Sequence, residues 1–200
     1  MKRVLVILAL CTMPASGAET QLAPRIVHAL TPIDSLPTKD EIIAVLPTNT
    51  LDELAKLARD PYEDFGVRLR AVRALPQFCT TSCAGTPPHQ ALVSLFASVP
   101  SEPPDRTSAG EKILLVRATI EALGATGSRD AADVTRLATY LDNPSRDIRA
   151  AAAFALRDLC NPSARPALRA RYTIEVGSVG VPQVRLAISE ALRGLDTCGN

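Results

Sequence analysis

The chain has 200 residues, of which 46% are hydrophobic and only 4% are aromatic, with no Trp. This length and apolar content suffice for one hydrophobic core, and the abundance of alanine and leucine favours close-packed helices over a β-sandwich. The formal net charge of +1 creates no strong field for nucleic acid or anionic lipid, so neither is expected as a partner.

The N-terminal segment has the pattern of a secretory signal peptide. Lys2 and Arg3 precede the short apolar run VLVILALC, and small residues end the segment at Ala18. We therefore expect residues 1–18 to be removed, the mature protein to be periplasmic or secreted, and no integral membrane segment to remain, because the run is shorter than the roughly 20 residues that span a bilayer. Lipidation at Cys11 is an alternative, although a bulky residue precedes this cysteine.

Residues 19–37 form a Pro-rich leader, in which His28 is expected to be a solvated or packing residue. A helical domain is predicted for residues 38–200. Capping-box patterns mark its first two helix starts and pair Thr38 with Glu41 and Thr50 with Glu53.

An alanine-rich helical pattern then recurs four times. An apolar residue at position 0 is followed by mostly small or apolar residues at +3, +4, +7, +8 and +11, which together make one face of a helix. The four predicted helices, called framed helices below, have position 0 at Val67, Leu115, Ile148 and Val184. Each has Ala and Leu at +7 and +8. The zero positions are 48, 33 and 36 residues apart, and the two shorter intervals have the length of a two-helix unit.

A second helical pattern precedes each framed helix. These patterns lie at residues 51–60, 89–99, 131–141 and 164–174. The alanine faces would let neighbouring helices approach closely, so each pair could pack against the pairs before and after it. We therefore predict an all-α fold: a short α-solenoid of about four stacked antiparallel helix pairs. An unrelated helical bundle is the alternative.

Two of the copies carry a resemblance to a known family. The segments DNPSRDIRAAAAFALRDL and GVPQVRLAISEALRGL resemble HEAT repeats, especially the short bacterial kind similar to the HEAT-like repeats of phycobilisome lyases. The resemblance covers residues 50–195 and is specific for the fold rather than for the function. The copy that begins at Leu115 departs from the pattern, because its arginine is shifted to Arg117.

Arginine occupies position +1 of the other three copies, as Arg68, Arg149 and Arg185. The resemblance implies that these arginines, with Asp60 and Asp142 in the turns ahead of two of them, form a polar ladder between repeats. The other interpretation is an anion-binding stripe, because the planar guanidinium suits carboxylates and phosphates.

Four cysteines remain after signal removal, and an even number in an exported protein indicates disulfides. Cys79 and Cys83 lie four residues apart beside a predicted helix end, and stacking would bring Cys160 and Cys198 to one edge, so we predict these two pairs among the three possible pairings. A zinc site from Cys79, Cys83 and His89 lacks a fourth ligand, so no metal is expected.

The outward side of the framed helices is the predicted binding surface. Positions +1, +2, +5, +6 and +9 are expected to face away from the core, Val72 and Ile120 among them. The candidate partner-binding residues are Arg68, Arg117, Arg149, Phe154, Arg157, Arg185 and Arg193. Such a mixture of arginine and apolar groups suits an extended acidic or amphipathic protein or peptide.

No catalytic motif accompanies this surface: the sequence has no nucleophile elbow, phosphate loop or zinc-binding helix. We expect a non-catalytic protein-binding or scaffold module of the cell envelope, without a cofactor. The alternative implied by the resemblance is a HEAT-like lyase or accessory factor acting on a tetrapyrrole-carrying protein. The irregular segments 79–88 and 99–110 are either binding loops or surface padding, and the sequence does not indicate the oligomeric state.

Overall fold

The computed structural model describes residues 22–32, 35–80, 83–177 and 181–198. Over these residues the chain forms ten α-helices and three short 3-10 helices, and none of them is in a strand. The prediction of an all-α fold is confirmed. The expected signal peptide, with its cleavage point at Ala18 and with Cys11, lies outside the described residues.

The helices follow the predicted segments closely. The α-helices are α1 (Leu22–Ala29), α2 (Lys39–Val45), α3 (Thr50–Arg59), α4 (Phe65–Ala74), α5 (Pro87–Ser101), α6 (Ala109–Ala125), α7 (Ala131–Ala138), α8 (Arg146–Asp158), α9 (Arg165–Val176) and α10 (Pro182–Thr197). The 3-10 helices are η2 (Leu75–Phe78), η3 (Thr139–Asp142) and η4 (Pro162–Ala164). The four framed helices are therefore α4, α6, α8 and α10, and a shorter or similar helix precedes each.

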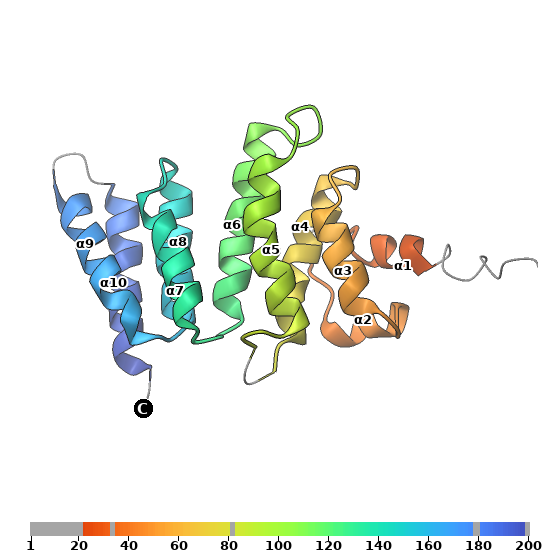
Figure 1. Cartoon of the computed structure of the whole chain (residues 1–200), viewed down its shortest axis with the longest axis horizontal. Coiled ribbons are helices and arrows are strands. Elements are labelled where there is room, and N and C mark those ends of the chain that lie inside the picture. Colours follow the sequence, from red (N-terminus) through yellow and green to blue (C-terminus); the bar gives the residue numbers. More distant parts are fainter. Residues whose placement is uncertain (1–21, 33–34, 81–82, 178–180, 199–200) are drawn as a thin grey trace, which may run out of the picture.

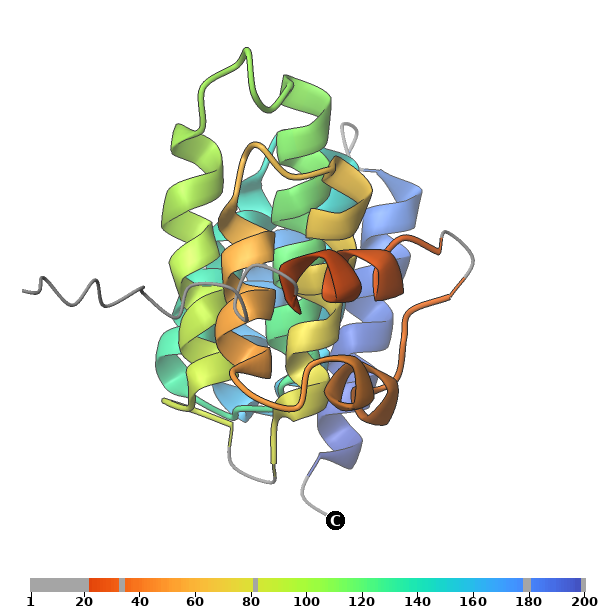
Figure 2. The same ribbon diagram turned by 90° about the vertical axis from the view of Figure 1, so that its right-hand side faces the viewer.

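The helices pack as two layers of consecutive pairs (Figures 1 and 2). The framed helices contact one another in chain order, α4 with α6, α6 with α8, and α8 with α10. The other layer contains α3, α5, α7 and α9, each in contact with the framed helix that follows it. Figure 2 looks along the row from its N-terminal end, with α1 in front, α3 and α5 on the left, and α4 and α10 on the right.

Small residues set the spacing between framed helices. The predicted alanine positions Ala71, Ala118, Ala152 and Ala187 are all buried. At the tightest point, a Cβ added to Gly124 of α6 would lie only 2.6 Å from the Cα of Ala155 in α8. The two helix backbones therefore meet without a side chain between them, which larger residues would prevent.

The buried arc of the framed helices is wider than predicted. Val72 and Ile120 at position +5 are fully buried, although we expected this position to face solvent. The reason is that each framed helix contacts the helix of its own pair and also one or two neighbouring framed helices. The outward strip of the framed helices is therefore narrower than predicted.

The predicted domain boundary at residue 38 also needs correction. Part of the expected leader forms α1, and Ile26 and Leu30 from this segment are fully buried in the common core. The guanidinium of Arg70 in α4 donates hydrogen bonds to the carbonyls of Leu30 and Thr31. His28 is exposed, as the solvated interpretation expects.

Helix caps confirm one expectation and contradict another. The Thr38–Glu41 capping box is present, and its hydrogen bonds lower the pKa of the Glu41 carboxyl. At the start of α3, however, Asn49 is the N-cap residue in a left-handed conformation, and Thr50 lies inside the helix with its hydroxyl donating to the Leu46 carbonyl. The predicted capping box at Thr50 is therefore wrong.

The expected loop at 99–110 is shorter than predicted. Helix α5 continues to Ser101, and α6 begins at Ala109 behind a capping box formed by Ser108 and Glu111. The extra residues of the long interval thus lengthen two helices, which extend beyond their neighbours in Figure 1.

Both predicted disulfides are present. Cys79 and Cys83 have their Cα atoms 5.1 Å apart, and Cys160 and Cys198 have theirs 5.4 Å apart. The first bond closes a short local loop between η2 and α5. The second joins the C-terminal ends of α8 and α10, two successive framed helices.

Replacing Gly124 by Ala should destabilise the protein by about 1–3 kcal/mol, because the added methyl group forces α6 and α8 apart. The matched control is Gly110→Ala in the same helix, where an added Cβ meets nothing within 4 Å. That change should leave stability unchanged or raise it by up to about 1 kcal/mol. Urea unfolding monitored by circular dichroism measures both, and equal effects would contradict the close contact.

The two disulfides should differ in their effect on stability. Loop-closure entropy predicts a loss of about 4 kcal/mol when Cys160 and Cys198 are both changed to Ala, and about 2 kcal/mol for Cys79 and Cys83. The difference follows from sequence separations of 38 and 4 residues. Chemical denaturation measures the stability of the two double variants. A larger loss of stability for the variant without Cys79 and Cys83 would contradict the prediction.

Candidate functional site

The seven predicted partner-binding residues divide into two groups. Arg68 and Arg149 are 1% and 8% exposed, so a partner cannot reach them. The accessible group has three exposed and two half-buried members: Arg117, Arg185, Arg193, Phe154 and Arg157.

Arg68 joins the first pair of helices, α3 and α4, to the second pair, α5 and α6. Its guanidinium donates to the Glu102 carboxylate at 2.6 Å and to the Thr107 hydroxyl at 3.2 Å. The Thr107 hydroxyl also donates to Glu102. These buried contacts hold the segment between α5 and α6 against the start of α4, which favours a structural role for this segment.

Arg149 makes the corresponding connection between the third and fourth pairs. It donates to the Glu175 carboxylate at 2.9 Å and to two backbone carbonyls near its own helix start. Burial raises the pKa of Glu175, but hydrogen bonds from the Val181 amide and from Arg171, together with the charge of Arg149, outweigh it and leave this pKa below its ordinary value. The glutamate is therefore held as a carboxylate.

The assignment of Arg68 and Arg149 to a partner surface is thus wrong. Both arginines tie one helix pair to the next, as the ladder interpretation expects, but the acids differ from those expected. They are Glu102 and Glu175, at the ends of α5 and α9, whereas Asp142 pairs with Arg171 at 3.1 Å. Arg185 in α10 has the same frame position, no described helix pair covers it, and it is exposed.

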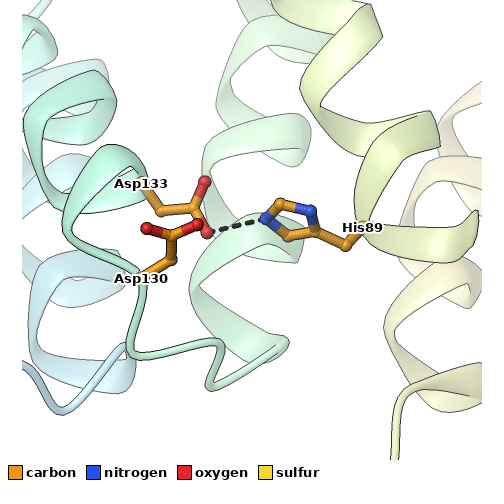
Figure 3. A group of neighbouring side chains, drawn as sticks. All are labelled: His89, Asp130 and Asp133. Carbon is orange, nitrogen blue, oxygen red and sulfur yellow. Dashed lines mark hydrogen bonds and ion pairs between the residues drawn. The ribbon is translucent and has the colours of Figure 1, made fainter. Parts of the chain in front are cut away.

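A buried cluster that the sequence did not indicate lies between α5 and α7. The side chains of His89, Asp130 and Asp133 each bring one potential metal ligand atom within 4.8 Å of the others (Figure 3). His89 Nε2 lies 2.7 Å from Asp133 Oδ2. His89 and Asp133 are 7% and 1% exposed. The zinc site that the sequence suggested as a possibility, with His89, Cys79 and Cys83 as ligands, is not formed, because the two cysteines are joined in a disulfide.

Hydrogen-bond directions in this cluster favour a structural tie over a metal site. The Gly85 amide donates to His89 Nδ1 at 3.2 Å, so the ring proton resides on Nε2 and is donated to Asp133. A metal on Nε2 would instead require a proton on Nδ1 and an acceptor facing it. Ser128 donates to Asp133, and Asp130 accepts from the Ala132 amide as the cap of α7. The ligand atoms are therefore already engaged.

Each junction between consecutive pairs consequently has one buried polar tie within the described residues. The first and third use an Arg–Glu pair, and the second uses His89 and Asp133. The second pair is also the one whose framed helix has Val116 in place of arginine at +1. The histidine tie thus occurs at the junction that lacks the arginine.

The accessible candidates lie on the outward side of α6, α8 and α10, which we call the framed face. A pocket of about 120 Å³ between these helices is lined in part by Arg117 and Phe154. The Arg117 guanidinium donates to Glu121 at 2.7 Å. Arg157 lies 5.1 Å from the centre of the Phe154 ring. The framed face is therefore a mixture of an aromatic ring and partly neutralised charges.

Exposed apolar side chains accompany the candidate residues on the framed face. Ile113 and Leu114 in α6 are each 46% exposed, and Leu186 in α10 is 58% exposed. These side chains add apolar area to the framed face.

Comparison with known proteins adds no family or function. No protein-family model matches the chain, and neither a curated protein nor a solved structure matches it. Within the described part of the chain, no helix is both long and apolar enough to span a membrane.

Removing one partner of a buried tie should be far more costly than the same change on the surface. We expect Arg68→Met to destabilise the protein by about 3 kcal/mol, because Glu102 stays buried without its counter-charge. Arg185→Met, at the same frame position but exposed, should change stability by less than about 0.5 kcal/mol. Urea unfolding compares them, and similar losses would show that the Arg68 tie contributes little.

Proposed function

We propose that the chain is a short HEAT-like α-solenoid that acts as a non-catalytic protein-binding or scaffold module, exported to the periplasm or the cell exterior. The repeated frame and the chain-order contacts of α4, α6, α8 and α10 support the solenoid assignment. The two disulfides favour an oxidising compartment.

The single observation that carries the binding role is the framed face. Exposed apolar side chains there have no role in the core, and the buried Arg–Glu and His–Asp pairs are engaged in tying helix pairs together. The function thus rests on a surface that can cover a partner segment with apolar groups and fix its orientation with charges.

Charge on the framed face favours contact with acidic groups near α10. Arg117 is paired with Glu121, and Arg157 with Asp158 at 2.8 Å. Arg185 and Arg193 are exposed, and no ion pair joins either to another described residue. An amphipathic acidic segment would place its apolar side on Leu186 and its carboxylates on these two arginines.

A reversal of charge on the framed face tests this proposal. The double variant Leu186→Glu with Arg193→Glu and the wild-type protein are immobilised separately and exposed to a cell-envelope extract. The variant should capture at least tenfold less of the specific partner proteins than the wild type does. Quantitative mass spectrometry measures the capture.

The matched control is Arg169→Glu, which changes an exposed arginine on α9 in the other layer. It should retain the wild-type partners. Equal capture by all three proteins would place the binding surface elsewhere, and circular dichroism confirms that each variant is folded.

A further inference from the structure

A hollow on the surface lies in the layer opposite the framed face. A groove of about 470 Å³ runs between α5 and α7, where these two helices make few contacts with each other. It is lined by Val93, Phe96, Ala97, Ala132, Thr135, Arg136, Thr139 and Tyr140. Several of these residues are exposed, so the groove is open along its length.

The groove has an aromatic floor. The ring centres of Phe96 and Tyr140 lie 5.4 Å apart, and Phe96 is 9% exposed. Partial burial raises the pKa of Tyr140, so its hydroxyl keeps its proton and can donate a hydrogen bond. The floor therefore combines apolar area with a polar donor.

Arg136 is the charged residue among those that line the groove. Its guanidinium lies 5.9 Å from the centre of the Phe96 ring. Its Nε is buried and has no hydrogen-bond partner among the described residues, and no described carboxylate forms an ion pair with it. A buried donor without an acceptor is rare, because it loses its hydration without compensation.

We propose that this groove binds an extended peptide segment of a partner protein in which a carboxylate side chain stands next to an apolar one. The carboxylate accepts hydrogen bonds from the Arg136 guanidinium, and the apolar side chain covers Phe96 and Tyr140. The positive lining selects an acidic group, and the open shape suits an extended chain better than a small molecule, which binding sites usually enclose on most sides. The inference is independent of the framed face.

A random-peptide display library is the probe for this site. Peptides selected on the full mature protein and counter-selected on Arg136→Gln should be enriched in an Asp or Glu beside an apolar residue. Changing that acid to its amide should weaken binding to the wild-type protein about tenfold or more. On Arg136→Gln, the acidic and amide peptides should bind equally, which isolates the contact between the carboxylate and the guanidinium.

The control Arg169→Gln changes an exposed arginine outside the groove and should bind as the wild type does. Nuclear magnetic resonance with the isotope-labelled protein should place the shift changes on α5, α7 and the Arg136 Nε–H. Enriched peptides without acids, shift changes confined to α6, α8 and α10, or no enrichment would overturn the proposal. Benzoate alone is the test for a site that binds small carboxylic acids. If benzoate shifts the same resonances and saturates, the groove is a small-molecule site and the proposal is overturned.

Discussion

The direct contact between successive framed helices is the constraint on which the rest of the structure depends. Where Gly124 meets Ala155, two backbones approach so closely that one methyl group would separate them. This spacing buries the alanine faces. It also brings polar groups from different pairs within hydrogen-bond reach, which makes the buried ties possible.

The apolar pattern predicted the helices because it reports burial directly. Four frames with Ala and Leu at fixed positions indicated α4, α6, α8 and α10, and the paired first helices followed from the intervals between them. The disulfide pairs were also predictable, since both depend on where helices end. The pattern of Ser108 and Glu111 could have indicated the start of α6, but the surrounding Pro, Ser and Gly residues favoured a loop.

The candidate site was less predictable, because the pattern of apolar positions in one helix does not show which other helices will pack against it. Arg68 and Ile120 lie on the same flank of their helices, and both are covered by the next pair of helices along the row. The tie between His89 and Asp133 was hidden for a different reason. These residues are separated by 44 positions, and neither belongs to the repeated frame. They meet only because the start of α5 lies near the start of α7 in the folded chain.

The covalent link between α8 and α10 makes the two ends of the molecule unequal. In a row where each pair contacts only its neighbours, local opening begins most readily at an end. The last pair cannot detach while Cys160 and Cys198 remain joined. The first helices are held by noncovalent contacts, such as those of Arg70 to the Leu30 carbonyl and of Gln77 to the Pro37 carbonyl. We therefore expect the amide hydrogens of α1 and α2 to exchange with solvent faster than those of α10.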